Sequence, residues 1–312
     1  MEYNILGRSG LKVSIVGLGC GGPSQLGQRA NKSEKESVSL VRQALDMGIN
    51  FLDTAEVYST ESIVGSAIRE IPRDRVVIST KKHPPSPHSA DPAGELRKGL
   101  EQSLRKLKTD YVDIYHLHGI APEQYPFSLN SLAPVLLKMR EEGKIRCLGI
   151  TEAFVPDPEH QMLHRAVEDG CWDVVMVGFN MLNQSARNCV FPKTLEKGIG
   201  VLVMFALRRA LSRPSRLKQV VTELKQKGLV PSSCNSESPL EFLTRDGKAS
   251  TIPDAAYRYC RHEPGTHVIL TGTGNPEHLR TNVESLLKPP LPEEDLLRLR
   301  GLFGRVNCIT GD

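Results

Sequence analysis

Four residues between positions 53 and 118 have side chains suited to moving a proton: Asp53, Tyr58, Lys81 and His118. A free tyrosine has a pKa near 10, too high for a strong acid at neutral pH. An ammonium group within about 4–6 Å favours the phenolate and lowers that pKa. If the four side chains converge, Asp53 holds Lys81, Lys81 tunes Tyr58, and His118 orients a substrate carbonyl or shares the proton. The set therefore predicts a general acid.

The surrounding sequence predicts strands that end at these positions. Short apolar runs, typical of strands buried on both faces, occur near 13–16 and at 49–53, 75–80, 111–116, 146–150, 173–177, 201–205 and 267–270. A capping box at 33–36 begins a helix between the first two runs. The clearest amphipathic helix covers 92–107, and others are expected at 61–70, 129–142, 158–168, 184–197 and 216–227.

Eight strands that alternate with helices predict an α/β fold with a parallel sheet covered on both faces. Eight such units in roughly 300 residues favour a closed (β/α)8 TIM barrel in a single domain over 1–312. A β-hairpin that turns at 7–10 precedes the barrel, and a long loop at 229–251 separates the seventh strand from the eighth and is expected over the barrel mouth. The carboxyl ends of barrel strands form one catalytic face, so the four residues are expected to meet there.

Composition excludes several classes of protein. The net charge is only +4, and no run of Lys and Arg interleaved with aromatic residues indicates nucleic-acid binding. Seven scattered cysteines without a Cys-x-x-Cys pair indicate reduced thiols in a cytoplasm and no metal site. No apolar run reaches membrane-spanning length, and Met1–Asn4 does not begin a signal peptide. A cytoplasmic protein without membrane or nucleic-acid partners is expected, and its oligomeric state is left open.

Three motifs offer competing interpretations. The Gly-x-Gly-x-x-Gly spacing at 17–22 is that of a Rossmann nucleotide site, but the next helix begins only near Ser33, so a glycine-rich loop after the first barrel strand is favoured. His116 and His118 share a strand face as metal ligands do, yet no further ligands complete a set. Lys81 at a barrel mouth is also compatible with Schiff-base chemistry.

The same residues carry a resemblance to a known family. The order Asp53-x-x-x-x-Tyr58, then Thr80-Lys81, then Asp113 to His118 resembles the catalytic tetrad of the aldo-keto reductases, and 6–14 and 149–151 resemble further landmarks of that family. The resemblance implies an enzyme that reduces an aldehyde or ketone, or oxidises the alcohol, with a nicotinamide cofactor. It assigns proton donation to Tyr58, control of its pKa to Lys81 and Asp53, and orientation of the carbonyl to His118.

The resemblance also implies cofactor-binding positions. Thr151-Glu152 stands where the family usually has Ser-Asn, Met176 where it has Gln, Phe205 where an aromatic ring stacks on the nicotinamide, and Asn282 where adenine is contacted. Gly272 and His278 occupy the usual positions of the 2′-phosphate clamp, for which Arg208, Arg209 and Arg280 are alternative cations. Gly272-Thr273-Gly274 leads into a helix capped by Asn275, and a helix N-terminus can hold a phosphate. NADP(H) is favoured and NAD(H) remains possible.

The expected function is thus NAD(P)H-dependent carbonyl reduction of a small-molecule substrate that the sequence does not name. Two alternatives stay open. One is a non-catalytic or redox-sensing subunit that binds nicotinamide cofactors. The other is a Schiff-base lyase that uses Lys81.

Overall fold

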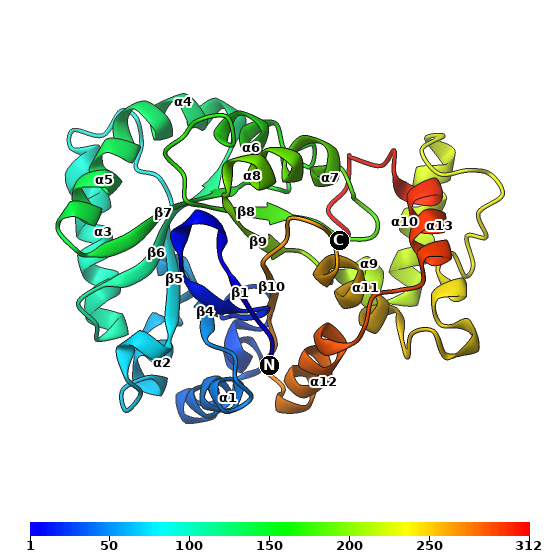
Figure 1. The fold of residues 1–312 in the computed structure, drawn as a ribbon, viewed down its shortest axis with the longest axis horizontal. Coiled ribbons are helices and arrows are strands. Elements are labelled where there is room, and N and C mark those ends of the chain that lie inside the picture. The colour runs from blue at the N-terminus through cyan, green and yellow to red at the C-terminus, as the bar shows by residue number, and fades with distance from the viewer.

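Eight parallel strands form a closed barrel in the computed structural model, which describes residues 1–312 apart from the side chain of Asp246 (Figure 1). In order around the barrel they are β3 (Val16–Gly19), β4 (Phe51–Asp53), β5 (Val77–Lys82), β6 (Val112–Ile120), β7 (Ile145–Glu152), β8 (Val174–Gly178), β9 (Gly200–Met204) and β10 (Val268–Thr271), with β10 pairing back onto β3. The predicted (β/α)8 barrel is confirmed.

The hairpin predicted before the barrel is present as β1 (Tyr3–Ile5) and β2 (Lys12–Ser14), paired antiparallel. Its apolar side chains Leu6, Leu11 and Val13 join the cluster that fills the barrel interior, which includes Phe51, Val77, Ile114, Val174 and Leu202. The hairpin therefore closes the amino-terminal end of the barrel, and the opposite end is left for chemistry.

The first barrel strand lies further along the chain than expected. The run at 13–16 divides between β2 and β3, and β3 continues through Gly17 to Gly19. A Cβ at Gly17 would approach Leu270 and Val268 side chains to 2.7 and 2.8 Å. Glycine here makes room inside the barrel, so part of the predicted glycine-rich loop is the strand itself.

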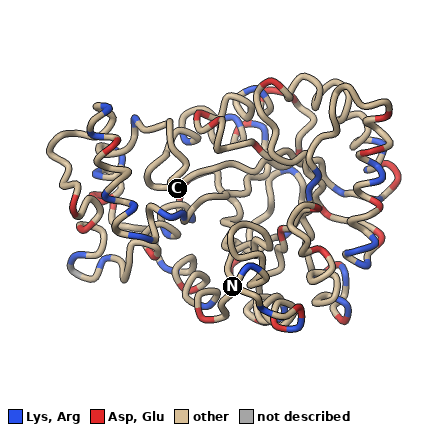
Figure 2. The backbone as a smooth tube through the Cα atoms, turned by 180° about the vertical axis from the view of Figure 1, so that it is seen from behind, with Lys and Arg blue, Asp and Glu red and all other residues tan. Residues whose placement is uncertain are grey.

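Helices surround the barrel on the outside. They are α1 (Glu34–Asp46), α2 (Glu61–Ala67), α3 (Pro92–Leu107), α4 (Tyr125–Phe127), α5 (Ala133–Glu141), α6 (Gln161–Ala166), α7 (Ala186–Cys189), α8 (Phe191–Lys197), α9 (Arg209–Ser212), α10 (Pro214–Gln226), α11 (Ile252–Arg261), α12 (Pro276–Leu287) and α13 (Glu293–Phe303). The capping box at Ser33 and the bounds of α3 match the prediction. Charged residues of both signs lie mainly on these outer helices and loops (Figure 2). Among the described residues, no helix is long and apolar enough to cross a membrane.

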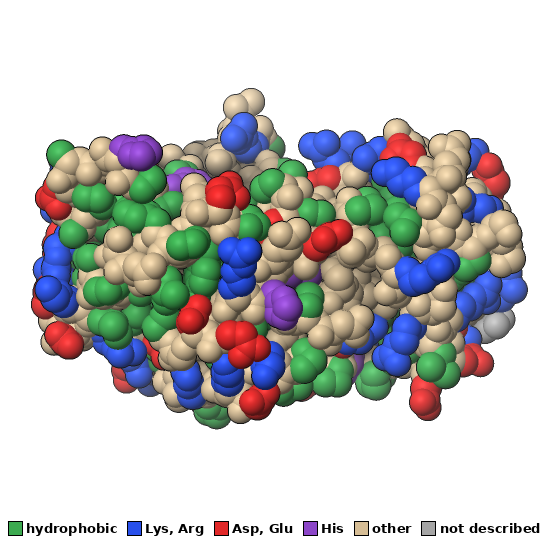
Figure 3. Space-filling model, turned by 90° about the horizontal axis from the view of Figure 1, so that it is seen from above, with side chains coloured by type: hydrophobic (Ala, Val, Ile, Leu, Met, Phe, Trp, Pro, Cys, Tyr) green, Lys and Arg blue, Asp and Glu red, His purple; other side chains and the backbone are tan. Residues whose placement is uncertain are grey.

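The long segment at 229–251 does separate β9 from β10, but, except for its last residue Thr251, it does not lie over the barrel mouth. It lies beside α10 and α13, at the end of the molecule away from the barrel (Figure 1). Leu240 and Leu243 are fully buried there, and the guanidinium of Arg298 in α13 lies 4.2 Å from the centre of the Phe242 ring. Apolar residues in the segment thus anchor it to helices, which its Pro, Ser and Gly content did not indicate. Basic side chains gather at this end of the molecule (Figure 3).

Candidate active site

The predicted Asp53–Lys81 pair is present at the carboxyl end of the barrel. Nζ of Lys81 donates to Oδ2 of Asp53 and to the backbone oxygen of Thr54, both at 2.7 Å. Ser79 donates to the other Asp53 oxygen at 2.8 Å. Lys81 is completely buried and Asp53 nearly so. Burial alone would lower the pKa of Lys81, but the charges of Asp53 and Tyr58 raise that pKa above its ordinary value. Lys81 is therefore a fixed ammonium ion.

Tyr58 and His118 meet above this pair. Tyr58 ends a short helical turn after β4, and its hydroxyl lies 3.3 Å from Nε2 of His118 on β6. Nζ of Lys81 lies 4.9 Å from the centre of the Tyr58 ring. Burial, together with the charge of Lys81, lowers the pKa of His118 to about 2. His118 is therefore neutral at physiological pH and can donate a hydrogen bond from one ring nitrogen.

The pKa of Tyr58 differs from the expectation. Burial raises it above its ordinary value, and the opposing effect of Lys81 is smaller. Lys81 thus lowers the pKa of Tyr58, as predicted, but by less than burial raises it. A raised pKa keeps the phenol protonated at neutral pH, which is the form that a proton donor needs.

A cavity of about 590 Å³ opens beside Tyr58. It runs from Asp53 and Tyr58, past the loop after β9, to the loop after β10 and the first turns of α12. Its walls include Gly19, Gly21, Gly22, Pro23, Ser24, Met176, Met204, Ser212, Thr251, Tyr257, Leu270 and Thr281. Tyr257, Thr281 and Ser212 were missed in the sequence. Thr281 precedes Asn282 on the same helix and could have been inferred, whereas helix α11, which carries Tyr257, was not predicted.

Most of the predicted cofactor positions line this cavity, and three do not. Those on its wall are Phe205, Arg208, Gly272, Thr273, His278 and Asn282. Gly274 instead packs on the backbone of Gly27, where a Cβ would approach Cα to 2.4 Å. The Thr151 hydroxyl is buried and accepts a hydrogen bond from the backbone nitrogen of Gly119 at 2.7 Å.

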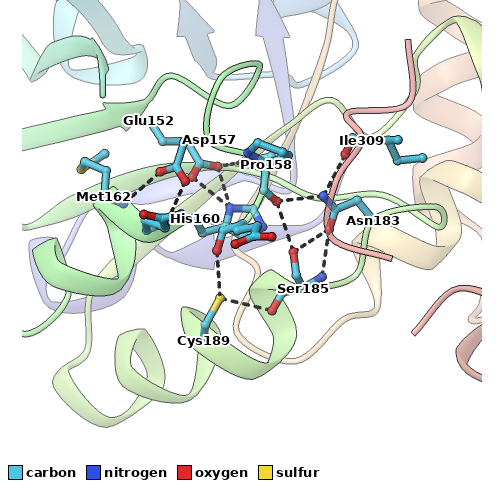
Figure 4. A network of polar contacts seen from close by, with 12 residues as sticks. Glu152, Asp157, Pro158, His160, Met162, Asn183, Ser185, Cys189 and Ile309 are labelled. Carbon is cyan, nitrogen blue, oxygen red and sulfur yellow. Dashed lines mark hydrogen bonds and ion pairs between the residues drawn. The ribbon is translucent and has the colours of Figure 1, made fainter. Parts of the chain in front are cut away.

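Glu152 does not line the cavity and is part of a buried polar network (Figure 4). Nδ1 of His160 lies 2.9 Å and 3.0 Å from its two carboxylate oxygens, and the backbone nitrogen of Gly178 donates to it at 2.7 Å. Both carboxylate oxygens therefore have protein partners. Glu152 contacts His160 and Gly178 here, unlike the cofactor contact that the resemblance implies for this position. Sequence reasoning did not connect it to His160, eight residues later.

Two further histidines differ from one another. His116 is completely buried in the barrel next to Gly149, whose Cβ would lie 2.2 Å from its Nδ1. His83 is exposed, and its ring stacks on that of His118 with centres 4.5 Å apart and planes at 12°. Among the described residues, no group of three His, Cys, Asp or Glu side chains is placed to hold a metal ion.

Comparison with known proteins agrees with this geometry. The model of the Aldo/keto reductase family matches residues 17–302. The chain belongs to this family. It is an oxidoreductase of the aldo-keto reductase type.

Among relatives in the aldo/keto reductase family, L-galactose dehydrogenase of Arabidopsis thaliana is 34% identical, with 99% of this chain and 97% of that protein covered. The uncharacterized oxidoreductase YqkF of Bacillus subtilis is 27% identical, with 96% of both chains covered. The fold also matches the holo form of aldo-keto reductase AKR11C1 from Bacillus halodurans, with a TM-score of 0.74, 22% identity and coverage of 99% and 98%. An aldo/keto reductase from Klebsiella pneumoniae, solved with NADP and acetate, matches with a TM-score of 0.70, 23% identity and coverage of 97% and 96%.

The cavity fits the nicotinamide cofactor of this family in size and chemistry. Its volume lies within the range of small-molecule sites. Gly19 at the end of β3 and Gly272 just after β10 lie on its wall, and a Cβ at Gly272 would approach the oxygen of Gly19 to 3.1 Å. Arg208 and Phe205 line the same cavity, with the Arg208 guanidinium 4.2 Å from the centre of the Phe205 ring and paired with Asp312.

Proposed function

We propose that this protein reduces an aldehyde or ketone to an alcohol, or catalyses the reverse, with Tyr58 as the proton donor. The observation that carries the proposal is the buried Lys81–Asp53 pair beneath Tyr58. Tyr58 lines the cavity, and its hydroxyl lies 3.3 Å from Nε2 of His118. Proton transfer by a positioned side chain is worth about 10²–10⁴-fold in rate.

Each residue has a defined part in this reaction. The protonated phenol of Tyr58 gives its proton to the carbonyl oxygen as negative charge develops there. Neutral His118 donates a hydrogen bond to the same oxygen and fixes its position. The ammonium of Lys81, 4.9 Å from the ring centre, stabilises the phenolate that remains, and Asp53 holds Lys81 in place. When bound, a nicotinamide dinucleotide supplies the hydride.

The Schiff-base alternative is not supported. Such chemistry needs a neutral lysine amine that a carbonyl can reach. Lys81 is completely buried, forms an ion pair with Asp53, and does not line the cavity. A subunit that only binds the cofactor would not need this buried pair beside a tyrosine at the cavity wall.

We favour NADP(H) as the cofactor over NAD(H). The solved NADP complex of the Klebsiella relative supports this preference, as does Arg208 on the cavity wall. Phe205, Arg208, Gly272, Thr273, His278 and Asn282 would hold the dinucleotide. Thr151 would contribute only through the backbone of Gly119, beside His118.

The test is the variant Tyr58→Phe, compared with Tyr3→Phe. The Tyr3 hydroxyl is exposed and bonds only to the backbone of Gly48, so its removal controls for the loss of a phenol elsewhere. NADPH and NADH are first titrated by fluorescence. Turnover is then measured on a panel of aldehydes and ketones, with L-galactose oxidation included because of the Arabidopsis relative. Tyr58→Phe is expected to lose at least about 10²-fold in kcat and to keep its dinucleotide affinity. Unchanged turnover in Tyr58→Phe would remove Tyr58 from the reaction.

A further inference from the structure

The backbone of Phe205 is held in a conformation that non-glycine residues rarely adopt. Its φ is +65°, in the left-handed region. Such a conformation persists only where the surroundings enforce it. The Asn180 side chain donates to the backbone oxygen of Phe205 at 3.2 Å. The Phe205 ring also makes an edge-to-face contact with Phe154, with centres 5.3 Å apart and planes at 82°. Phe205 itself lines the cavity.

Phe154 is fixed on two further sides. It is 2% exposed and lies over Gly178, where a Cβ would approach its ring to 2.2 Å. On another side its ring stacks on that of His160, with centres 5.2 Å apart and planes at 14°. A residue larger than glycine at 178 would therefore displace the ring of Phe154.

His160 is in turn fixed by Glu152, and neither side chain is exposed. Figure 4 shows the imidazole facing the carboxylate, and nearby the Asp157 carboxylate accepts hydrogen bonds from the backbone nitrogens of Gln161 and Met162 at the start of α6. His160 also has a left-handed backbone, with φ of +62°. Because Glu152 binds the backbone nitrogen of Gly178 as well, one carboxylate secures both surfaces that contact Phe154.

We propose that the Glu152–His160 pair and Phe154 are positioning residues that set the ring of Phe205 against the bound dinucleotide. This inference rests on the proposed function, because that function supplies the dinucleotide that Phe205 would contact. The chain of contacts explains why a buried acid and a buried histidine stand just outside the cavity wall. A buried polar pair whose groups are hydrogen-bonded favours a single packing arrangement of the side chains around it.

The first test compares Phe154→Leu with Phe191→Leu. Phe191 is equally buried and also forms an edge-to-face pair, with Phe179, but it does not line this cavity. Both variants are expected to lower the melting temperature. Only Phe154→Leu should weaken NADPH binding and slow single-turnover hydride transfer at saturating NADPH, each by about 10-fold or more, because small misplacement of reacting groups is costly. Equal effects of the two variants on NADPH binding and hydride transfer would overturn the proposal.

The second test separates the contact between Glu152 and His160 from the ring of His160. His160→Phe keeps a ring against Phe154 but leaves the Glu152 carboxylate buried without its partner, so stability and NADPH affinity should both fall. Adding Glu152→Gln removes that charge and keeps an oxygen for Gly178, so the double variant should recover both properties. Recovery of stability without recovery of NADPH affinity would contradict the proposed chain of contacts.

A third measurement does not depend on cofactor binding. Trp172 is the single tryptophan and is completely buried. In a Phe205→Trp background, acrylamide quenching therefore reports mainly on position 205. Quenching should increase when Phe154→Leu is added and stay constant when Phe191→Leu is added; the reverse would overturn the proposal. If the parent protein bound neither NADPH nor NADH, the proposed function would fail, and the quenching comparison would still decide whether Phe154 positions residue 205.

Discussion

The two ends of the cavity are built in different ways. At one end, Asp53 and Tyr58 form the wall. The strands behind it carry Asp53, Lys81 and His118, and the Lys81–Asp53 contact there is 2.7 Å and buried. At the other end, His278 and Asn282 lie on α12, at the surface, and His278 is exposed. Among the described lining residues, Arg208 is the one Lys or Arg, and it is paired with Asp312.

The buried ion pair at one end and the exposed residues at the other should respond differently to substitution. A buried ion pair has a large desolvation penalty and is sensitive to the loss of either partner. Exposed charges are screened by water and contribute little individually. Substitutions at the strand-borne end should therefore cause large losses of stability and turnover. Substitutions at the helix-borne end should change the affinity for the dinucleotide without unfolding the protein.

The largest effect is expected for Lys81→Met. The variant leaves Asp53 buried without its counter-ion, which typically costs about 3–5 kcal/mol of stability. Turnover should fall by about 10²-fold or more, because Tyr58 loses the charge that stabilises its phenolate. Urea unfolding and steady-state kinetics measure the two losses. The double variant Lys81→Met with Asp53→Asn should regain stability and remain inactive; a double variant that regained activity would contradict the role of Lys81.

A fall in pH is expected to lower the stability by an intermediate amount through His118. His118 has a pKa of about 2 in the folded protein, against an ordinary value of 6.5. The unfolded chain therefore binds a proton at this site below about pH 6.5 and the folded protein does not, so the contribution to stability falls as the pH drops from 6.5 toward 2.

Between pH 7.5 and pH 5.0 this one group should remove at most about 2 kcal/mol of stability, since part of the ring is exposed. Urea unfolding at both pH values in the parent and in His118→Gln measures the contribution as a difference. An identical pH dependence in the two proteins would show that His118 is protonated as readily in the folded state as in the unfolded chain.

The contrast between the two ends also explains what could be predicted from the sequence. The strands that carry Asp53, Lys81 and His118 have continuous apolar runs, and the carboxyl ends of barrel strands share one face. Their convergence was therefore predictable from the order of residues alone. The net pKa of Tyr58 was not, because it depends on how much burial opposes Lys81, and burial is set by the whole fold.

The rest of the site lies where local patterns carry less information. The position of 229–251 depends on contacts such as that between Phe242 and Arg298, which are far apart in sequence. Glu152 was assigned to the cofactor by its position in the chain, yet it contacts His160, whose backbone is left-handed. An ordinary sequence pattern does not report such a conformation in a histidine.

The smallest effect is expected at the exposed end of the cavity, for His278→Arg. An arginine there adds a permanent cation near Asn282, on the same wall. NADPH carries a phosphate that NADH lacks, so affinity for NADPH should rise by about 3- to 10-fold and that for NADH should stay constant, as expected for an exposed charge pair. Fluorescence titration with both dinucleotides measures the ratio. Arg280→Ala is the matched control, since Arg280 lies near Glu277 and Glu284 on the same helix and does not line the cavity. If His278→Arg strengthened NADH and NADPH equally, position 278 would lie near a phosphate that both cofactors share, and the choice between them would be made elsewhere on the wall.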